Sequence, residues 1–161
     1  MTTTAQTPWL INVLEAFRDV MNRGKAANTP DTAIDFPKPG GFKGRYKPFV
    51  WPVIDPKTIT DKRIKHRAVV ITGIIFQRDD GNRHEEEVIQ AIAAYSKMAE
   101  TLLLESDTDD SAFNRAFVGH AQPDGEGGLQ FDGGKDFDGR LGLVDRWLVV
   151  GSPAEAGQPN A

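Results

Sequence analysis

Hydrophobic residues follow a helical spacing in some segments of the chain and form nearly continuous runs in others, and this difference predicts its main helices and strands. Apolar residues recur at helical spacing over residues 9–21 and again over residues 88–103. Residues 68–76 and 141–150 are instead nearly continuous apolar runs rich in β-branched side chains, which is typical of strands. The predicted strands cluster as hairpins and do not alternate strictly with helices. This order predicts an α+β fold, a mainly antiparallel sheet with two helices packed on one face.

The ends of both predicted helices carry residues that are typical of helix termini. Thr7 can cap the first helix with Pro8 at its first position, and Gly24 is a natural stop. Asn82 can cap the second helix, with Glu85 three residues later in a capping box. Both helices are amphipathic, so each needs a surface on which to pack.

The run over residues 68–76 is expected at the centre of the sheet because both of its faces are apolar. Gly73 within it indicates a bulge or the close approach of a neighbouring group. The preceding strand, over residues 49–54, contains Pro52, which limits it to a sheet edge or a bulge.

Weaker patterns predict the connections between these strands. A turn is expected at Asp55-Pro56, followed by a basic hairpin over residues 57–67 whose lysines would discourage pairing with other chains. Residues 111–122 alternate between two sets of side chains, which predicts a further strand. An Asp- and Gly-rich insertion over residues 123–139 precedes the last strand.

Residues 26–47 form an extended loop with no hydrophobic period and several proline and glycine residues. Aromatic and basic side chains alternate in its second half, as at Phe42, Lys43 and Tyr46. Such a segment can anchor a loop on a neighbouring subunit, or it can follow a phosphate backbone. The expected organisation is one assembly domain over residues 1–150 and a flexible tail over residues 151–161.

Composition narrows the class of protein further. The 161 residues include no cysteine, which excludes disulfides and thiolate metal sites. No apolar run reaches the ~20 residues of a membrane helix, and the first residues lack the features of a secretory signal, so synthesis in the cytosol and no membrane partner are expected. Residues 1–78 carry 13 basic and 6 acidic side chains, whereas residues 79–161 carry 6 and 17. This asymmetry allows complementary surfaces, although position in the sequence does not fix position on a surface.

No motif predicts catalysis, a cofactor or a metal. The three histidines His66, His84 and His120 are widely separated, and no nucleophile elbow, Walker loop or dinucleotide fingerprint is present. The aspartates at 132, 136 and 138 resemble a calcium loop, but an EF-hand counted from Asp132 or Asp136 has no acidic residue at its last position. The chain is therefore not expected to be an enzyme.

Two other classes of function stay open at this point. The first is a small ligand-binding or enzymatic domain on a ferredoxin-like sheet, with His120, Asp136 and Asp138 as its candidate residues. The second is a nucleic-acid binder that uses residues 38–47 and 57–67, which the acidic isoelectric point near 5.4 disfavours.

The order of elements and several local patterns resemble the tail terminator proteins of lambda-like phages, a family of tail-completion and head–tail joining proteins. The resemblance covers roughly residues 8–150 and rests on an N-terminal amphipathic helix, a charged hairpin tip, and an Asp/Gly turn before a second helix. It also includes the proline-led strand KPFVWPV at 47–53, the long strand RAVVITGIIF at 67–76 and the closing strand LVDRWLVV at 143–150.

The resemblance implies a structural protein of the virion. It implies a self-assembled ring, typically of six copies, that caps the tail tube at its head-proximal end, stops its polymerisation and joins it to the head connector. DNA would pass through the ring without sequence readout. The alternative within the same group is another connector or neck protein. The candidate residues for contacts with other subunits or partners are Lys38, Phe42, Lys43, Arg45, Tyr46, Lys47, Lys62, Arg63, Lys65, Asp132, Asp136 and Asp138.

Overall fold

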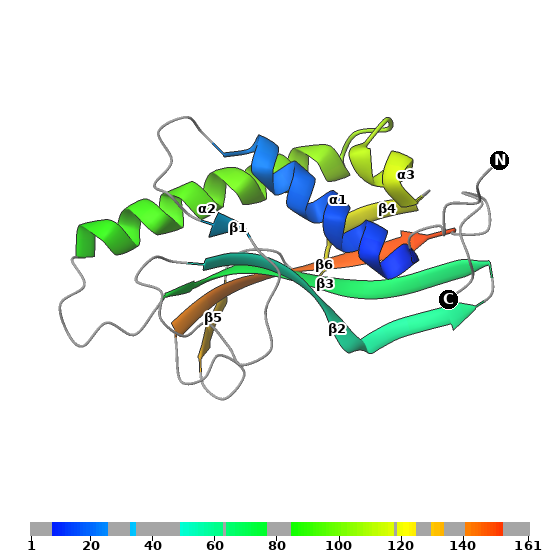
Figure 1. Ribbon diagram of the computed structural model, residues 1–161, viewed down its shortest axis with the longest axis horizontal. Coiled ribbons are helices and arrows are strands. Elements are labelled where there is room, and N and C mark those ends of the chain that lie inside the picture. Colours follow the sequence, from blue (N-terminus) through cyan, green and yellow to red (C-terminus); the bar gives the residue numbers. More distant parts are fainter. Residues whose placement is uncertain are drawn as a thin grey trace, which may run out of the picture.

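The structure, a computed structural model, describes residues 8–25, 33–34, 49–62, 64–76, 85–117, 119–124, 130–133 and 141–152. Its elements follow in the order α1 (Trp9–Arg23), β1 (Ala33–Ile34), β2 (Phe49–Lys62), β3 (Lys65–Phe76), α2 (Glu85–Ser106), α3 (Ala112–Phe117), β4 (Gly119–Pro123), β5 (Gln130–Gly133) and β6 (Leu141–Gly151). The described strands form one sheet, and the helices lie on one of its faces (Figure 1). The predicted α+β class with a mainly antiparallel sheet is confirmed. None of the described helices has the length and apolar character needed to cross a membrane.

The strands lie in the order β1-β2-β3-β6-β4. Strand β1 pairs with β2 in parallel, and the other pairs are antiparallel. Strand β5 also pairs with β6, alongside residues 141–144, whereas β4 pairs with residues 147–151. The two short strands therefore share one edge of β6, while β3 occupies its other edge along the whole length.

Strand β3 is central, as its apolar faces predicted. It pairs with β2 on one side and β6 on the other, and the β6 register continues without interruption through Gly73. Trp51 and Val144 are the neighbours of Gly73 on the two flanking strands, and they form one buried cluster. The bulge predicted as one explanation for Gly73 is therefore wrong. A position without a side chain lets the indole and the valine meet across β3.

The main core lies between the sheet and the helices. It takes the apolar stripe of α1, the inner face of α2, two phenylalanines of α3 and one face of the sheet. Phe17 at its centre packs against Phe113, with ring centroids 4.8 Å apart, and against Trp147 at 6.1 Å. The largest fully buried side chains are Trp9, Trp51, Tyr95, Phe17, Phe113, Phe117, Met21, Ile74, Met98, Leu102 and Val13.

The strand predicted over residues 111–122 is wrong in its first half, because residues 112–117 form α3. The side chain of Ser111 accepts a hydrogen bond from the Asn114 backbone N–H at 3.1 Å, which caps this helix. Phe113 and Phe117 are four residues apart, so they share one helical face and both are buried. The chain becomes a strand only at Gly119, and the fold has three described helices where two were predicted.

The turn predicted at Asp55-Pro56 is also wrong, because β2 continues through it to Lys62. The register with β3 shifts between Asp55 and Thr60, so residues 56–59 form a bulge. Pro52 lies beyond the two residues of β2 that pair with β1. Among the described residues, no strand therefore pairs with the edge of β2 at Pro52 that faces away from β3. This suits a proline, which has no backbone N–H to donate.

The predicted boundaries of the other segments shift by a few residues. Pro8 is the N-cap of α1 and not its first helical residue. The loop predicted at 26–47 includes β1, and the strand predicted to end at residue 150 includes Gly151. The rest of that loop, the cap predicted at Asn82 and the tail beyond residue 152 lie outside the described residues.

Candidate assembly surfaces

The structure places three of the predicted interface residues in described strands. Lys62 and Lys65 are exposed at the end of the β2–β3 hairpin, and Asp132 lies in β5. The remaining predicted interface residues lie outside the described residues: Lys38, Phe42, Lys43, Arg45, Tyr46, Lys47, Arg63, Asp136 and Asp138. The structure therefore gives the position of only these three predicted interface residues.

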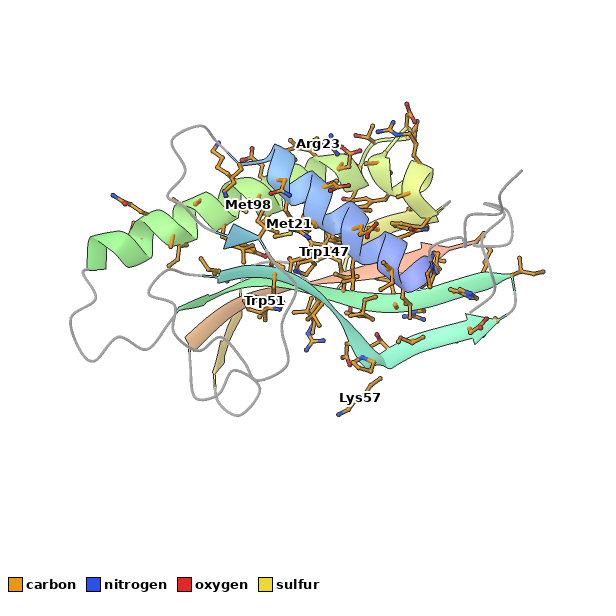
Figure 2. All side chains as sticks on the ribbon, in the orientation of Figure 1. Met21, Arg23, Trp51, Lys57, Met98 and Trp147 are labelled. Carbon is orange, nitrogen blue, oxygen red and sulfur yellow. The ribbon has the colours of Figure 1, made fainter. Side chains whose placement is uncertain are left out.

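The distal half of the β2–β3 hairpin extends past the start of α1 (Figure 1). Two apolar side chains are exposed there, Ile59 at 41% and Ile64 at 62%. Three exposed lysines, Lys57, Lys62 and Lys65, lie on the same half of the hairpin. Figure 2 shows Lys57 at the bend of β2, extending away from the sheet on the side opposite the helices. We define the hairpin tip as Lys57, Ile59, Lys62, Ile64 and Lys65. It combines apolar contact area with positive charge.

The bulge in β2 is fixed by hydrogen bonds that begin at Thr58. Its hydroxyl donates to the Asp55 carbonyl at 2.7 Å and accepts from the Val69 backbone N–H at 2.8 Å. The Lys57 N–H donates to the Asp55 carboxylate at 3.1 Å. That carboxylate also lies 3.7 Å from the guanidinium of Arg146 on β6. These bonds replace the ladder bonds that the bulge interrupts, so they hold Lys57 and Ile59 in place.

Exposed apolar and acidic side chains also gather at the C-terminal end of α2. Leu103 and Leu104 are 50% and 65% exposed. Glu100 and Asp107 lie three residues before and four residues after Leu103, so they share its face of the helix or its extension. We define the acidic helix end as Glu100, Leu103, Leu104, Asp107 and Asp109, all of which are exposed.

Neighbouring elements hold the acidic helix end in position. Glu105 forms an ion pair with Arg23 of α1 at 3.4 Å and accepts a hydrogen bond from the Ala112 backbone N–H. Asp110 pairs with Arg115 of α3 at 3.1 Å. The α2–α3 connection is thus tied to both neighbouring helices, and the exposed leucines are presented on an ordered surface.

The face of the sheet that carries no helix is apolar at its centre. Trp51, Val53, Ile71 and Val144 form one cluster there, in which Trp51 is only 2% exposed. The Asp55–Arg146 ion pair lies next to this cluster, because Asp55 follows Val53 on the same face of β2 and Arg146 is the register partner of Ile71.

A buried polar network links α2 to the sheet. Trp147 Nε1 donates to Thr72 Oγ1 at 3.0 Å, and the Tyr95 hydroxyl donates to Asp145 Oδ2 at 2.9 Å. Thr72 Oγ1 and the Tyr95 oxygen are 2.8 Å apart. Because Tyr95 gives its single proton to Asp145, Thr72 must donate to Tyr95. Each donor is therefore engaged, and the chain of bonds ends on the carboxylate.

Burial sets the protonation of both ends of this network. Burial and the nearby charge of Asp145 raise the pKa of Tyr95 well above its ordinary value, so the phenol stays protonated as a donor. Burial also raises the pKa of Asp145, and the hydrogen bond from Tyr95 offsets part of that rise. A satisfied network of this kind specifies how α2 packs on the sheet. It contains no unengaged proton donor for a reaction.

The raised pKa of Asp145 predicts a pH dependence of stability. A carboxyl whose pKa is higher in the folded chain contributes stability that is fully present below its unfolded pKa. That contribution is lost as the pH rises through the folded value. Asp145→Asn keeps an acceptor for Tyr95 but cannot ionise. Its free energy of unfolding, relative to wild type, should therefore increase as the pH rises above about 4, the ordinary pKa of an aspartate.

Urea denaturation at several pH values measures this difference. Asp109→Asn removes an equal charge from an exposed site and serves as the control. Its difference from wild type should change less with pH than that of Asp145→Asn. Equal pH profiles for Asp145→Asn and Asp109→Asn would contradict a role for burial at Asp145.

The histidines do not form a common site in the described residues. His66 is buried against Trp9, with ring centroids 5.3 Å apart, and its Nδ1 lies 3.0 Å from Asp61 Oδ1. It faces the helices, whereas His120 is exposed on β4 next to the inward-facing Ala121 and so faces the other way. His84 lies outside the described residues. No group of three or more potential metal-ligating side chains occurs among the residues that the structure describes.

Two of these features, the acidic helix end and the buried polar network, cannot be recognised from the sequence pattern. Leu103 continues the apolar stripe of α2, so it was expected to be packed, yet its side chain is half exposed. Tyr95 was likewise assigned to the apolar stripe. The available signal for its network is Asp145, a charged residue in a mostly apolar strand, which needs a partner when buried.

Comparison of the chain with models of known protein families and with curated protein sequences finds no match.

Proposed function

We propose that this chain is a structural subunit of a phage tail that forms a ring, caps the head-proximal end of the tail tube and joins it to the head connector. In this role it ends tube polymerisation and needs neither a cofactor nor catalytic residues. DNA passes through the lumen of the ring without contact to specific bases. The proposal follows the resemblance of residues 8–150 to the tail terminators of lambda-like phages.

The observation that carries the proposal is the hairpin tip. Ile59 and Ile64 are exposed on an extension that leaves the body of the fold, where no other described element covers them. Single exposed apolar residues are common on monomeric proteins. Two on one protruding hairpin that also carries exposed lysines instead match the mixture of apolar and polar side chains at a protein interface.

The polar side chains support an assembly role over a catalytic one. The buried groups Thr72, Tyr95 and Asp145 satisfy one another and tie α2 to the sheet. His120, a candidate for the ligand-binding alternative, is exposed on β4 and faces away from this network. A catalytic centre would be expected to gather such groups around a shared cavity.

The mass of the particle in solution tests the proposed function. Light scattering after size-exclusion chromatography should give a multiple of the 17.7 kDa chain, and electron microscopy should show rings. Mixed with the tail tube protein of the same phage, the rings should sit at tube ends and limit tube length. A chain that stays monomeric and never binds tube ends would refute the proposal, and rings that bind only the head connector would favour a neck protein.

A further inference from the structure

We propose that the hairpin tip of one copy of this chain docks on the acidic helix end of a second copy. This inference rests on the proposed function, because it names the subunit contact by which the ring closes. It commits to a protein partner of known surface, namely the chain itself. The two surfaces match in three properties: apolar area, charge and position in the fold.

Both surfaces expose apolar side chains to water, so their burial in a contact would be favourable. Ile59 and Ile64 lie on the hairpin tip, and Leu103 and Leu104 lie on the acidic helix end. They include four of the six large hydrophobic residues that are exposed in the described part of the chain. Contact between the two pairs would bury apolar surface on both copies, which is the main favourable term in association.

The charges around these apolar centres are opposite in sign. Lys57, Lys62 and Lys65 are exposed on the same half of the hairpin as the isoleucines. The leucines are accompanied by carboxylates at Asp107 and Asp109, and by Glu100, which pairs with Lys97 of the same helix at 3.6 Å. Facing surfaces of opposite charge speed association and fix the register of an interface.

The end of α2 also favours a cationic partner for a reason of backbone electrostatics. A helix C-terminus carries partial negative charge from its unpaired carbonyl groups, which basic side chains usually compensate. The last turn of α2, which lies within the described residues, contains no basic residue. Arg23 of α1 compensates Glu105, but Asp107 and Asp109 add further negative charge. Lysines from another copy would supply the missing compensation.

The charges also determine the geometry of self-association. Two hairpin tips repel each other, and so do two acidic helix ends, so a symmetric contact that uses the same surface twice is disfavoured. The favourable contact joins two different surfaces of identical chains. Such head-to-tail contacts close into rings when the rotation between neighbours allows it.

Charge reversal tests this contact. The double variant Lys62→Glu/Lys65→Glu should raise the concentration needed for assembly by about tenfold or more, because attraction becomes repulsion at two positions. The variant Asp107→Lys/Asp109→Lys should have a similar effect. A chain that carries all four substitutions should assemble again, since the opposite signs are restored. Assembly of wild type should also weaken with added salt, which screens exposed charges.

Two control variants separate the contact from net charge and folding. Arg67→Glu changes an exposed basic residue on the same hairpin, outside the tip. Glu15→Lys reverses an exposed acidic residue on α1. Both should assemble like wild type, and circular dichroism should confirm that every variant folds. Ile64→Asp adds a test of the apolar side chain and should also raise the concentration needed for assembly.

The outcomes distinguish this inference from the proposed function. If the wild-type chain forms rings and the variant Lys62→Glu/Lys65→Glu forms them equally well, the contact is wrong and the proposed function still stands. A wild-type chain that never assembles would overturn both. If the double variant instead loses low-salt binding to DNA while its mass is unchanged, the hairpin tip serves a nucleic acid and the inference is wrong. Rescue by the fourfold variant would support the contact.

Discussion

Phe17→Ala is expected to lower the free energy of unfolding by about 3–5 kcal/mol, the usual range for removing a buried phenylalanine. Phe17 is fully buried and contacts Phe113 of α3 and Trp147 of β6. Its ring thereby joins three elements, α1, α3 and β6. Removing it leaves a cavity that α1, α3 and the sheet cannot all close at once. Denaturation in urea, followed by circular dichroism, measures the loss.

Glu15→Ala provides the matched control for this substitution. Glu15 lies on the exposed side of the same helix, so its replacement should change the free energy of unfolding by no more than about 0.5 kcal/mol. A loss at Phe17 no larger than the loss at Glu15 would show that α1 does not pack on the core as described.

Gly119→Ala is expected to separate β4 from β6. A side-chain carbon at this position would lie 2.0 Å from the Val150 carbonyl oxygen and 2.5 Å from the Gly151 Cα. These are backbone atoms of the paired strand, so they cannot move aside as a flexible side chain would. The loss should reach or exceed the ~1–3 kcal/mol that is typical of overpacking. Urea denaturation measures it, and amide hydrogen exchange in β4 should rise with it.

Gln122→Ala tests whether β4 tolerates alanine where the space is open. Gln122 is exposed on the same strand, where it pairs with Leu148 of β6. Its replacement should leave the exchange of β4 amides close to that of wild type. Equal effects of the two substitutions would indicate that β4 is weakly paired and that Gly119 is not specially constrained.

The first of these predictions bears on function because α3 supports the acidic helix end. Arg115 of α3 pairs with Asp110, and the N-terminus of α3 is tied to Glu105. Loss of α3 packing should therefore disturb the presentation of Leu103 and Leu104. Variants of the hairpin tip leave this region intact, so an assembly defect in them reports on the contact itself.

The elements that could be predicted from sequence are those with a strong, long pattern. The amphipathic stripe of α1 and the apolar run of β3 have one stable placement each, because burying those side chains requires it. The α+β class followed from their order. The strand predicted for the short stretch before β4 was wrong, because Phe113, Arg115 and Phe117 fit a two-residue period as well as a helical one. The Ser111 cap and the packing of Phe17 on Phe113 decide for the helix.

The sequence by itself determined the two main helices, the central strand and the basic character of the hairpin, since these depend on local spacing and residue type. Only the tertiary structure decided which apolar residues stay exposed. Ile64 and Leu104 carry the same local signal as buried residues, but the hairpin extends past the helices and the end of α2 lies at the surface. Burial depends on which elements meet in space, and that is a property of the whole fold.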